Sequence, residues 1–343
     1  MHIVGQIIAK NLQRRAPCTS GLWINPDKDD NWQAATEICA PLKLSSQDYA
    51  NYRFLKQAGA DIEFSAFPES GMGTCQWVIL NLPRQKALLA MMLDSVSSLL
   101  SDDGVLWLAG ENKAGIKSAD KLLKKYFGQV SKLDNARHCT LYEARKPLQK
   151  TAFSSSNYLQ RWDLDWHNNK LTIASYPGVF AHGRLDAGTA LLLQALAELP
   201  LYGDVLDFAC GAGLIGACIA VNHPHSNVSL LDSNALALAA SRETLAINQL
   251  KASVLASDGL SEVRRSYDFI ISNPPIHAGV KTDNLLSHGL LARVHEHINP
   301  GGMLVMVANR HLPYEKWLSQ RFARCTELSA NAQFKVIAAH QQS

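Results

Sequence analysis

A glycine-rich turn directly after an apolar strand is the first feature of this sequence that could bind a cofactor. Residues 205–208 predict a short, mostly apolar strand. The chain then passes through Gly211, Gly213 and Gly216 into a predicted helix. Glycine lets the backbone approach a ligand without a Cβ clash, and a helix start offers free N–H groups. This spacing matches a dinucleotide-binding turn, with Asp232 placed to hold a ribose. An NAD-dependent oxidoreductase is therefore one open interpretation.

An acidic residue in the strand bears on the choice of cofactor. Asp207 stands just before the glycines, where its carboxylate would repel the pyrophosphate of a dinucleotide. The same negative charge suits a cofactor that carries a cationic amino-acid portion. Asp207 therefore weighs against NAD and favours a cofactor of that second kind.

The segment Asn273-Pro274-Pro275 predicts a different piece of chemistry, the gripping of a flat amine. It closes a later strand, at the carboxyl edge where parallel sheets bind their ligands. The prolines fix φ, so the Asn273 side-chain oxygen and the Pro274 carbonyl can both accept hydrogen bonds from one NH₂ group. Two such acceptors favour a pyramidal nitrogen whose lone pair points at an electrophile. No strong general base is needed, because the nitrogen becomes acidic once it is alkylated.

These residues must be positioned by alternating strands and helices. Beyond residue 187 the pattern predicts helices over residues 187–199 and 234–249 and strands at residues 205–208, 228–231, 254–255, 267–272 and 303–307. This alternation predicts a parallel sheet covered on both faces. Residues 322–328 and 334–338 are expected to close the sheet as an antiparallel hairpin. A separate hairpin is predicted around the turn at residues 167–169.

The first half of the chain echoes the second. Residues 77–83 resemble 269–275, and residues 103–107 resemble 301–305. Within each half, a helical segment lies between these two stretches, at residues 88–100 in the first half and 285–298 in the second. This pattern indicates two copies of one α/β fold, although short segments of this kind also look alike by chance. The first copy has no glycine-rich turn, so we expect it to have lost its ligand site.

Taken together, these motifs resemble the class I S-adenosylmethionine-dependent methyltransferases that carry the amine motif N-P-P-(F/Y). Further segments resemble the RsmC family of guanine-N2 methyltransferases of small-subunit ribosomal RNA. They are residues 177–180, 185–193, 273–277 and 333–336 in the second half and residues 110–115 and 135–142 in the first. The resemblance covers nearly the whole chain and is most specific over residues 177–310.

The resemblance implies an α/β protein of two tandem Rossmann-like class I methyltransferase domains, the N-terminal one degenerate. Residues 1–150 would form the degenerate domain, without a cofactor site and with a possible RNA contact. Residues 158–343 would form the catalytic domain, which binds S-adenosyl-L-methionine. The boundary falls between residues 144 and 158, where basic residues, a proline and a run of serines interrupt the apolar pattern.

The resemblance also implies roles at the cofactor. Gly211 and Gly213 would approach it, and Asp207 would face its methionine amino group or a nearby water. Cys210 is also predicted to be a cofactor-binding residue, and we expect it to be a small packing residue rather than a nucleophile.

The remaining cofactor contacts are implied in the same way. Asp232 would accept hydrogen bonds from both ribose hydroxyls, and Asp258 would accept one from the adenine amino group. Asp186 and Thr189 would line the methionine end of the cofactor.

The predicted catalytic set is Asn273, Pro274, Pro275 and Ile276. The fourth position of the motif is usually aromatic, to stack on the target base, so Ile276 is a departure. Its apolar face can still cover a base, but a stacking energy of roughly 1–3 kcal/mol would be reduced. Phe180 or Phe334 is a candidate ring to replace it.

The implied substrate is the exocyclic N2 of one guanine in 16S ribosomal RNA, within the 30S subunit or its assembly intermediate. Such a guanine must be unpaired or flipped out of its helix. Three alternatives to this substrate stay open at this point. The same chemistry could act on a 23S ribosomal RNA guanine or on a protein glutamine, and the chain could be a non-catalytic RNA-binding assembly factor.

Composition limits the class of protein. The 343 residues are 47% apolar and 18% charged, which excludes a disordered chain or a coiled coil. No apolar stretch is long enough for a membrane span, and we expect no signal peptide and a cytoplasmic location. The seven cysteines form no C-x-x-C pair and the histidines show no ligand spacing, so no metal is expected. No heptad pattern suggests assembly, and we expect a monomer.

The basic residues are concentrated in the first half of the chain. Residues 1–150 hold 19 Lys and Arg against 15 Asp and Glu, although the net charge of the whole chain is only +3. Lys117, Lys121 and Lys124 fall on one face of a predicted helix. That face is either a phosphate-binding surface or an ordinary solvated face, which Asp120 interrupts.

Overall fold

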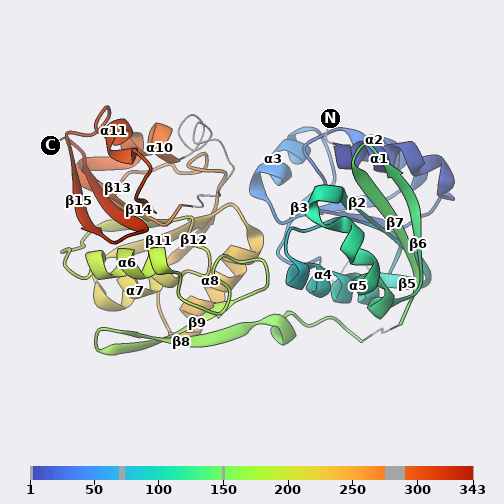
Figure 1. Cartoon of the computed structure of the whole chain (residues 1–343), viewed down its shortest axis with the longest axis horizontal. Coiled ribbons are helices and arrows are strands. Elements are labelled where there is room, and N and C mark those ends of the chain that lie inside the picture. The colour runs from blue at the N-terminus through green and yellow to red at the C-terminus, as the bar shows by residue number, and fades with distance from the viewer. Residues whose placement is uncertain (1–2, 69–73, 149–150, 275–289, 343) are drawn as a thin grey trace. The chain divides into compact units, whose positions relative to one another are not determined.

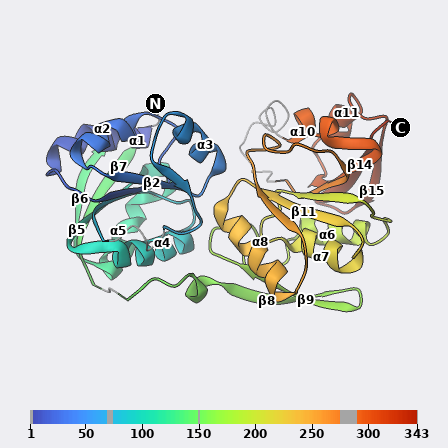
Figure 2. The same cartoon turned by 180° about the vertical axis from the view of Figure 1, so that it is seen from behind.

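The computed structural model describes residues 3–68, 74–148, 151–274 and 290–342. The chain divides into two compact units, residues 1–159 and 160–343. Each unit has its own seven-stranded sheet with helices on both faces, as Figures 1 and 2 show from opposite sides. The second unit also contains a separate two-stranded hairpin.

The first unit is built from short alternating elements. Its helices are α1 (Ile3–Asn11), α2 (Asn31–Ile38), α3 (Tyr49–Gln57), α4 (Lys86–Leu99) and α5 (Ala119–Tyr126). Its strands are β1 (Gly21–Ile24), β2 (Leu42–Ser46), β3 (Ile62–Phe64), β4 (Cys75–Asn81), β5 (Leu100–Glu111), β6 (Phe127–Ala136) and β7 (Cys139–Pro147). Successive strand residues point to opposite faces of the sheet. Leu22 accordingly packs in the core beneath α4 and α5, and Trp23 in the core beneath α1, α2 and α3.

The second unit begins with the hairpin β8 (Gln160–Trp166) and β9 (Asn169–Ser175). Its sheet contains β10 (Asp204–Phe208), β11 (Asn227–Asp232), β12 (Ser253–Ala256), β13 (Tyr267–Ser272), β14 (Ile298–Asn309), β15 (Arg324–Ala330) and β16 (Phe334–His340). Its helices are α6 (Ala187–Leu196), α7 (Leu214–Asn222), α8 (Ala235–Ile247), α10 (Leu290–Arg293) and α11 (Tyr314–Leu318). In Figure 1, α6, α7 and α8 lie on one face of this sheet, and α10 and α11 on the other.

The two sheets have the same topology. Their strand orders are β3-β2-β1-β4-β5-β7-β6 and β12-β11-β10-β13-β14-β16-β15, and in each the last two strands run antiparallel to their neighbours. The registers also agree, because Trp77 pairs with Gly21 in the first sheet as Phe269 pairs with Val205 in the second. The predicted duplication, the parallel sheet and the closing hairpin are therefore confirmed.

The matched registers show how the first copy differs chemically from the second. Counted along the paired strands, Trp23 stands where the second unit has Asp207, and Ser46 stands where it has Asp232. Trp23 is almost completely buried and fills its place with an indole ring. The first unit therefore lacks both of these carboxylates.

An asparagine is kept at the same position of both copies. Asn81 follows the register that places Asn273 after β13. Its Oδ1 accepts a hydrogen bond from the Trp23 Nε1–H at 2.9 Å, and its Nδ2 donates to Asp27 at 3.3 Å. Both ends of the Asn81 amide are thus used inside the first unit, so this residue is not presented to an amine.

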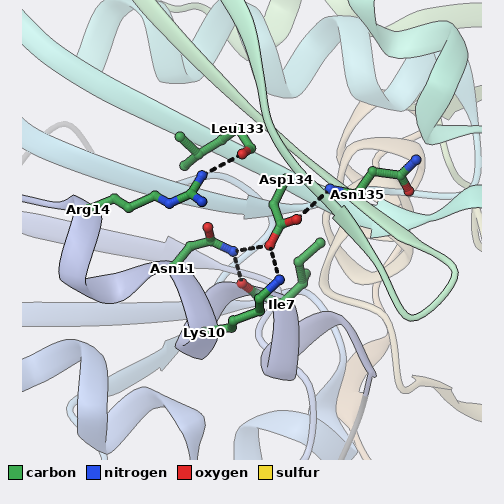
Figure 3. A network of polar contacts seen from close by, with 7 residues as sticks. All are labelled: Ile7, Lys10, Asn11, Arg14, Leu133, Asp134 and Asn135. Atoms are coloured by element: carbon green, nitrogen blue, oxygen red, sulfur yellow. Dashed lines mark hydrogen bonds and ion pairs between the residues drawn. The ribbon is translucent and has the colours of Figure 1, made fainter.

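One partly buried carboxylate ties α1 to the edge of the first sheet (Figure 3). Asp134 on β6 accepts hydrogen bonds from Lys10 at 2.9 Å and from the Asn11 amide at 2.7 Å. Arg14 donates to the Leu133 carbonyl oxygen at 2.7 Å beside them. The hydrogen bond from Asn11 and that from Lys10 lower the pKa of Asp134 to about 2.

Some element ends differ from their predictions. The helix predicted over residues 187–199 ends at Leu196. The helix predicted over 285–298 consists of α10 and a 3₁₀ turn at Val294–His297, and its earlier residues lie outside the described part of the chain. The predicted hairpin around residues 167–169 is confirmed, with His167 in the left-handed region at φ 49°.

Candidate active site

The glycine-rich turn after β10 has the geometry that its sequence predicts. Gly211 and Gly213 have φ values of 55° and 74°, in the left-handed region that favours glycine. A Cβ on Gly213 would lie 2.9 Å from Leu230 Cδ2 and 3.1 Å from the Ser241 backbone, so there is no room for a side chain at this position. A Cβ on Gly211 would meet nothing within 4 Å. Gly211 is therefore the glycine that leaves open space for a ligand.

Asp207 lies beneath this turn and holds it to the start of α7. Its Oδ2 accepts a hydrogen bond from the Gly216 N–H at 2.8 Å, and the residue is completely buried. Its Oδ1 has no partner among the described residues. Burial, with a smaller contribution from the charge of Asp232, raises the pKa of Asp207 to about 7. A single unpartnered carboxylate oxygen is thus buried next to the turn.

The two other predicted acids stand at the ends of neighbouring strands. Asp232 ends β11, and its two oxygens accept from the N–H groups of Gly211 and Asn234, each at 2.9 Å. Burial raises the pKa of Asp232 despite these hydrogen bonds. Asp258 is exposed and follows β12, two residues beyond that strand's end. The carboxyl edge of the sheet therefore carries Asp207, Asp232 and Asp258 in succession.

Asn273 follows β13, which pairs directly with β10. Its Nδ2 donates to the Thr189 Oγ1 at 2.8 Å and to the Asp186 Oδ2 at 3.3 Å. Pro274 is buried. Two members of the predicted catalytic set, Pro275 and Ile276, lie outside the described residues, so their predicted roles stay predictions.

One pocket brings five of the predicted site residues together: Asp186, Thr189, Cys210, Gly211 and Asn273. It is lined by Trp162, Ile173, Phe180, Ala181, Arg184, Asp186, Thr189, Ala209, Cys210, Gly211, Ala212, Leu214, Ile215 and Asn273. The glycine turn and Asn273 thus face the same space. Asp232 and Asp258 stand further along the same edge of the sheet. A larger cavity, of about 290 Å³, lies between the turn of the β8–β9 hairpin and α6 and α7, and none of the predicted site residues that the structure describes lines it.

Eight of the lining residues were not predicted as contacts of this pocket, and four of them come from outside the glycine turn and its helix: Trp162, Ile173, Ala181 and Arg184. Trp162 comes from the hairpin, and its Nε1–H is buried without a partner in the described part of the chain. Arg184 and Ala181 come from the loop before α6. The hairpin was recognisable from its alternating pattern, but a strand pattern does not show which later loop its side chains will meet.

The hairpin is fixed to the second unit by α8, which explains how Trp162 is positioned. The Thr244 hydroxyl accepts from the Ala174 N–H at 3.0 Å, and the Asn248 side chain bonds both the N–H and the carbonyl of Thr172, at 2.9 and 2.7 Å. These hydrogen bonds satisfy the open edge of β9 with side chains instead of another strand.

Comparison with known proteins gives the family. The model of the methyltransferase small domain matches residues 170–338, and that of the methyltransferase small domain N-terminal matches residues 6–162. A curated relative from Pseudomonas syringae pv. syringae, named ribosomal RNA small subunit methyltransferase C, is 38% identical over 82% of this chain and 86% of its own. A second protein of that name, from Aeromonas hydrophila, is 37% identical over 90% of each chain. This chain belongs to the ribosomal RNA small subunit methyltransferase C family.

A solved structure shows the same fold. It is described as the T. thermophilus 16S rRNA N2 G1207 methyltransferase (RsmC) in complex with AdoMet and guanosine. It aligns with a TM-score of 0.82 at 22% identity and covers 98% of this chain and 92% of its own. Membership of the ribosomal RNA small subunit methyltransferase C family decides between the interpretations of the glycine turn. The chain is a methyltransferase and not an oxidoreductase.

Cys210 has the environment of a packing residue in this family member. It is buried, and its Sγ lies 3.3 Å from the Ser241 Oγ. Burial and the nearby acids Asp232 and Asp207 raise the pKa of the thiol far above its ordinary value. A thiolate nucleophile is therefore disfavoured at this position.

Metal-binding clusters and membrane-spanning helices are both absent from the described residues. The described residues contain no group of three or more His, Cys, Asp or Glu side chains that could hold a metal ion. Within the same residues, no helix is both long enough and apolar enough to cross a bilayer.

Proposed function

We propose that this protein transfers the methyl group of S-adenosyl-L-methionine to the exocyclic N2 of a guanine in 16S ribosomal RNA. The observation that carries the proposal is that Asn273 and the glycine turn line one pocket, in a chain of the ribosomal RNA small subunit methyltransferase C family. The fold supports it, because class I methyltransferases bind ligands at this edge of the sheet.

The cofactor would lie along the carboxyl edge of the sheet. Gly211 offers the open space, and the Asp232 carboxylate would exchange its hydrogen bond from Gly211 for bonds from the ribose hydroxyls. Asp258, exposed beyond the neighbouring strand, would accept from the adenine amino group. The unpartnered Oδ1 of Asp207 would accept from the methionine ammonium group, which supplies the positive charge that this buried carboxylate lacks among the described residues.

The reaction moves one methyl group and one proton. The guanine N2 attacks the methyl carbon, the carbon–sulfur bond breaks, and S-adenosylhomocysteine leaves with the bonding electron pair. The Asn273 Oδ1 and the Pro274 carbonyl oxygen would accept hydrogen bonds from the amine and hold its lone pair toward the methyl group. The alkylated nitrogen then loses its proton to water. Phe180, which lines the pocket and is 56% exposed, would stack on the base where the motif itself carries Ile276.

The first unit would act on the RNA rather than on the cofactor. It has Trp23 and Ser46 in place of two cofactor-site carboxylates, so we assign it no cofactor. Lys117, just before α5, and Lys121, within it, are exposed, and neither forms an ion pair with a described residue. Lys124 is instead paired with Asp120 at 2.7 Å. The first two lysines would contact RNA phosphates. The protein would work as a cytoplasmic monomer on the 30S subunit or its assembly intermediate.

Replacement of Asn273 tests the amine-gripping role. Asn273→Ala should abolish methyl transfer and leave the affinity for S-adenosylmethionine within about threefold, because the side chain acts on the amine. Calorimetric titration of the cofactor and transfer of labelled methyl measure the two effects separately. Normal turnover by this variant would remove Asn273 from the mechanism.

A further inference from the structure

We propose that Asp186 and Thr189 are positioning residues that fix the orientation of the Asn273 amide, so that its oxygen faces the target amine. This inference rests on the proposed function, because it concerns the same site. It differs from the expectation that the two residues line the methionine end of the cofactor. What carries it is the pair of hydrogen bonds that both side chains receive from Asn273.

The contacts use the nitrogen end of the amide. The Asn273 Nδ2 carries two N–H donors, and it lies 2.8 Å from the Thr189 Oγ1 and 3.3 Å from the Asp186 Oδ2. Both donors therefore have acceptors within the protein. The Oδ1 of Asn273 makes no hydrogen bond to any described residue, and the residue lines the pocket. Only the acceptor end of the amide is left for a ligand.

The carboxylate decides which way the amide points. An ionised Asp accepts hydrogen bonds and cannot donate them. If the Asn273 amide turned over, its oxygen would face the oxygen of Asp186, and both would be acceptors. Its NH₂ group would then meet the NH₂ group of the substrate, with two sets of donors opposed. Asp186 thus excludes the orientation that cannot grip an amine, and Thr189 supplies the shorter hydrogen bond to the correct one.

Asp186 is itself held by the start of α6. As the N-cap residue, it accepts hydrogen bonds at its Oδ2 from the N–H groups of Gly188 at 2.9 Å and Thr189 at 3.1 Å. A Cβ on Gly188 would lie 3.1 Å from this oxygen and 3.5 Å from the Phe334 ring. Gly188, which lies between Asp186 and Thr189 in the chain, is therefore tightly confined. The helix therefore delivers both acceptors to Asn273 from one short, rigid segment.

The sharpest test is a pair of substitutions at Thr189. Thr189→Val removes the hydroxyl at nearly constant volume, and Thr189→Ser keeps it as the matched control. We expect Thr189→Val to lower kcat by about tenfold to a hundredfold, as when a group that orients a functional side chain is lost. The KM for RNA and the Kd for S-adenosylmethionine should stay within about threefold, and Thr189→Ser should restore most of kcat. A Thr189→Val enzyme with normal kcat would overturn the proposal. So would a loss confined to cofactor affinity, which is the expected effect of a methionine-binding role.

Asp186→Asn gives a second variant that keeps an oxygen for the helix cap. It removes the charge that selects the amide orientation, so we expect kcat to fall while the thermal unfolding midpoint changes little. The Kd for S-adenosylmethionine should stay within about threefold, because this charge acts on the amide and not on the cofactor. An unchanged kcat, or a loss confined to cofactor affinity, would show that Asp186 does not act through the Asn273 amide.

A spectroscopic measurement separates this inference from the proposed function. In protein labelled with ¹⁵N-asparagine, the Asn273 side-chain NH₂ should exchange with solvent slowly, and about tenfold or more faster in Thr189→Val, because its donors lose an acceptor. This result is expected whether or not the protein methylates 16S RNA. Fast exchange in the unmodified protein would overturn the inference, while failure of the unmodified enzyme to methylate any RNA would overturn the proposed function alone.

Discussion

The buried carboxylate of Asp207 makes the stability of the cofactor-free protein depend on pH, and Asp207→Asn should reveal it. The residue is completely buried, one oxygen accepts from the Gly216 N–H, and the other has no described partner. Burial raises the pKa of Asp207 to about 7. The native state therefore binds this proton more tightly than the unfolded chain. The stability that Asp207 contributes is fully present below about pH 4 and is lost as the pH rises through 7.

The magnitude follows from the part of this titration that lies above pH 5. Between pH 5 and pH 7 the unfolded chain has already lost the proton and the native state still holds it. These two pH units, at about 1.36 kcal/mol each, correspond to about 2.7 kcal/mol. The amide introduced by Asp207→Asn carries no charge at any of these values. The variant should therefore gain about 2.7 kcal/mol over the natural protein between pH 5 and pH 8, or roughly 5–10 °C in the unfolding midpoint.

Differential scanning calorimetry of both proteins, without cofactor and at several values between pH 5 and 8, measures this difference. Other titrating groups are common to the two proteins and largely cancel. The variant should also bind S-adenosylmethionine more weakly, because the proposed partner of the methionine ammonium group has lost its charge. A gap in unfolding midpoint that does not change with pH would refute the reasoning. The same holds for a natural protein that becomes the more stable of the two at pH 8.

Four further variants probe other parts of the molecule. Asp232→Ala should raise the Kd for S-adenosylmethionine by about tenfold or more, by loss of the proposed ribose hydrogen bonds, with calorimetric titration as the measurement. Asp134→Asn should destabilise the first unit by about 1 kcal/mol at pH 7 in urea unfolding. Because the pKa of Asp134 is lowered to about 2, this cost should shrink as the pH falls from about 4 toward 2. The double variant Lys117→Glu and Lys121→Glu should raise the KM for RNA. It should also reduce the slope of log KM against log salt concentration by about one to two units. Lys124→Glu alters a lysine that is already paired with Asp120 and should have a smaller effect.

The sequence predicts the sheets well because strand patterns and glycine turns are local signals. The strand at residues 267–272 appears with those bounds, and the echo of residues 77–83 in 269–275 corresponds to matched strand registers. The helix predicted over 187–199 is three residues too long. Its apolar pattern continues past Leu196, but the helical hydrogen bonds there give way to turns.

The finer arrangement of the site could not be predicted, because it depends on contacts between distant parts of the chain. Asp186 and Thr189 are 87 and 84 residues from Asn273, and only the folded sheet brings them together. Asp207 was expected at the cofactor, and the sequence contains no sign that one of its oxygens is used by Gly216. Trp162 belongs to a hairpin whose place over the pocket is set by α8.

Transfer of labelled methyl from S-adenosylmethionine tests the central claim most directly. The substrates would be 30S subunits, 50S subunits and naked 16S RNA from cells that lack this protein, with Asn273→Ala as the inactive control. We expect label in N2-methylguanine from 30S subunits or 16S RNA, and none with the variant. Label found only on 50S subunits, or none on any RNA despite measurable cofactor binding, would contradict the proposed substrate.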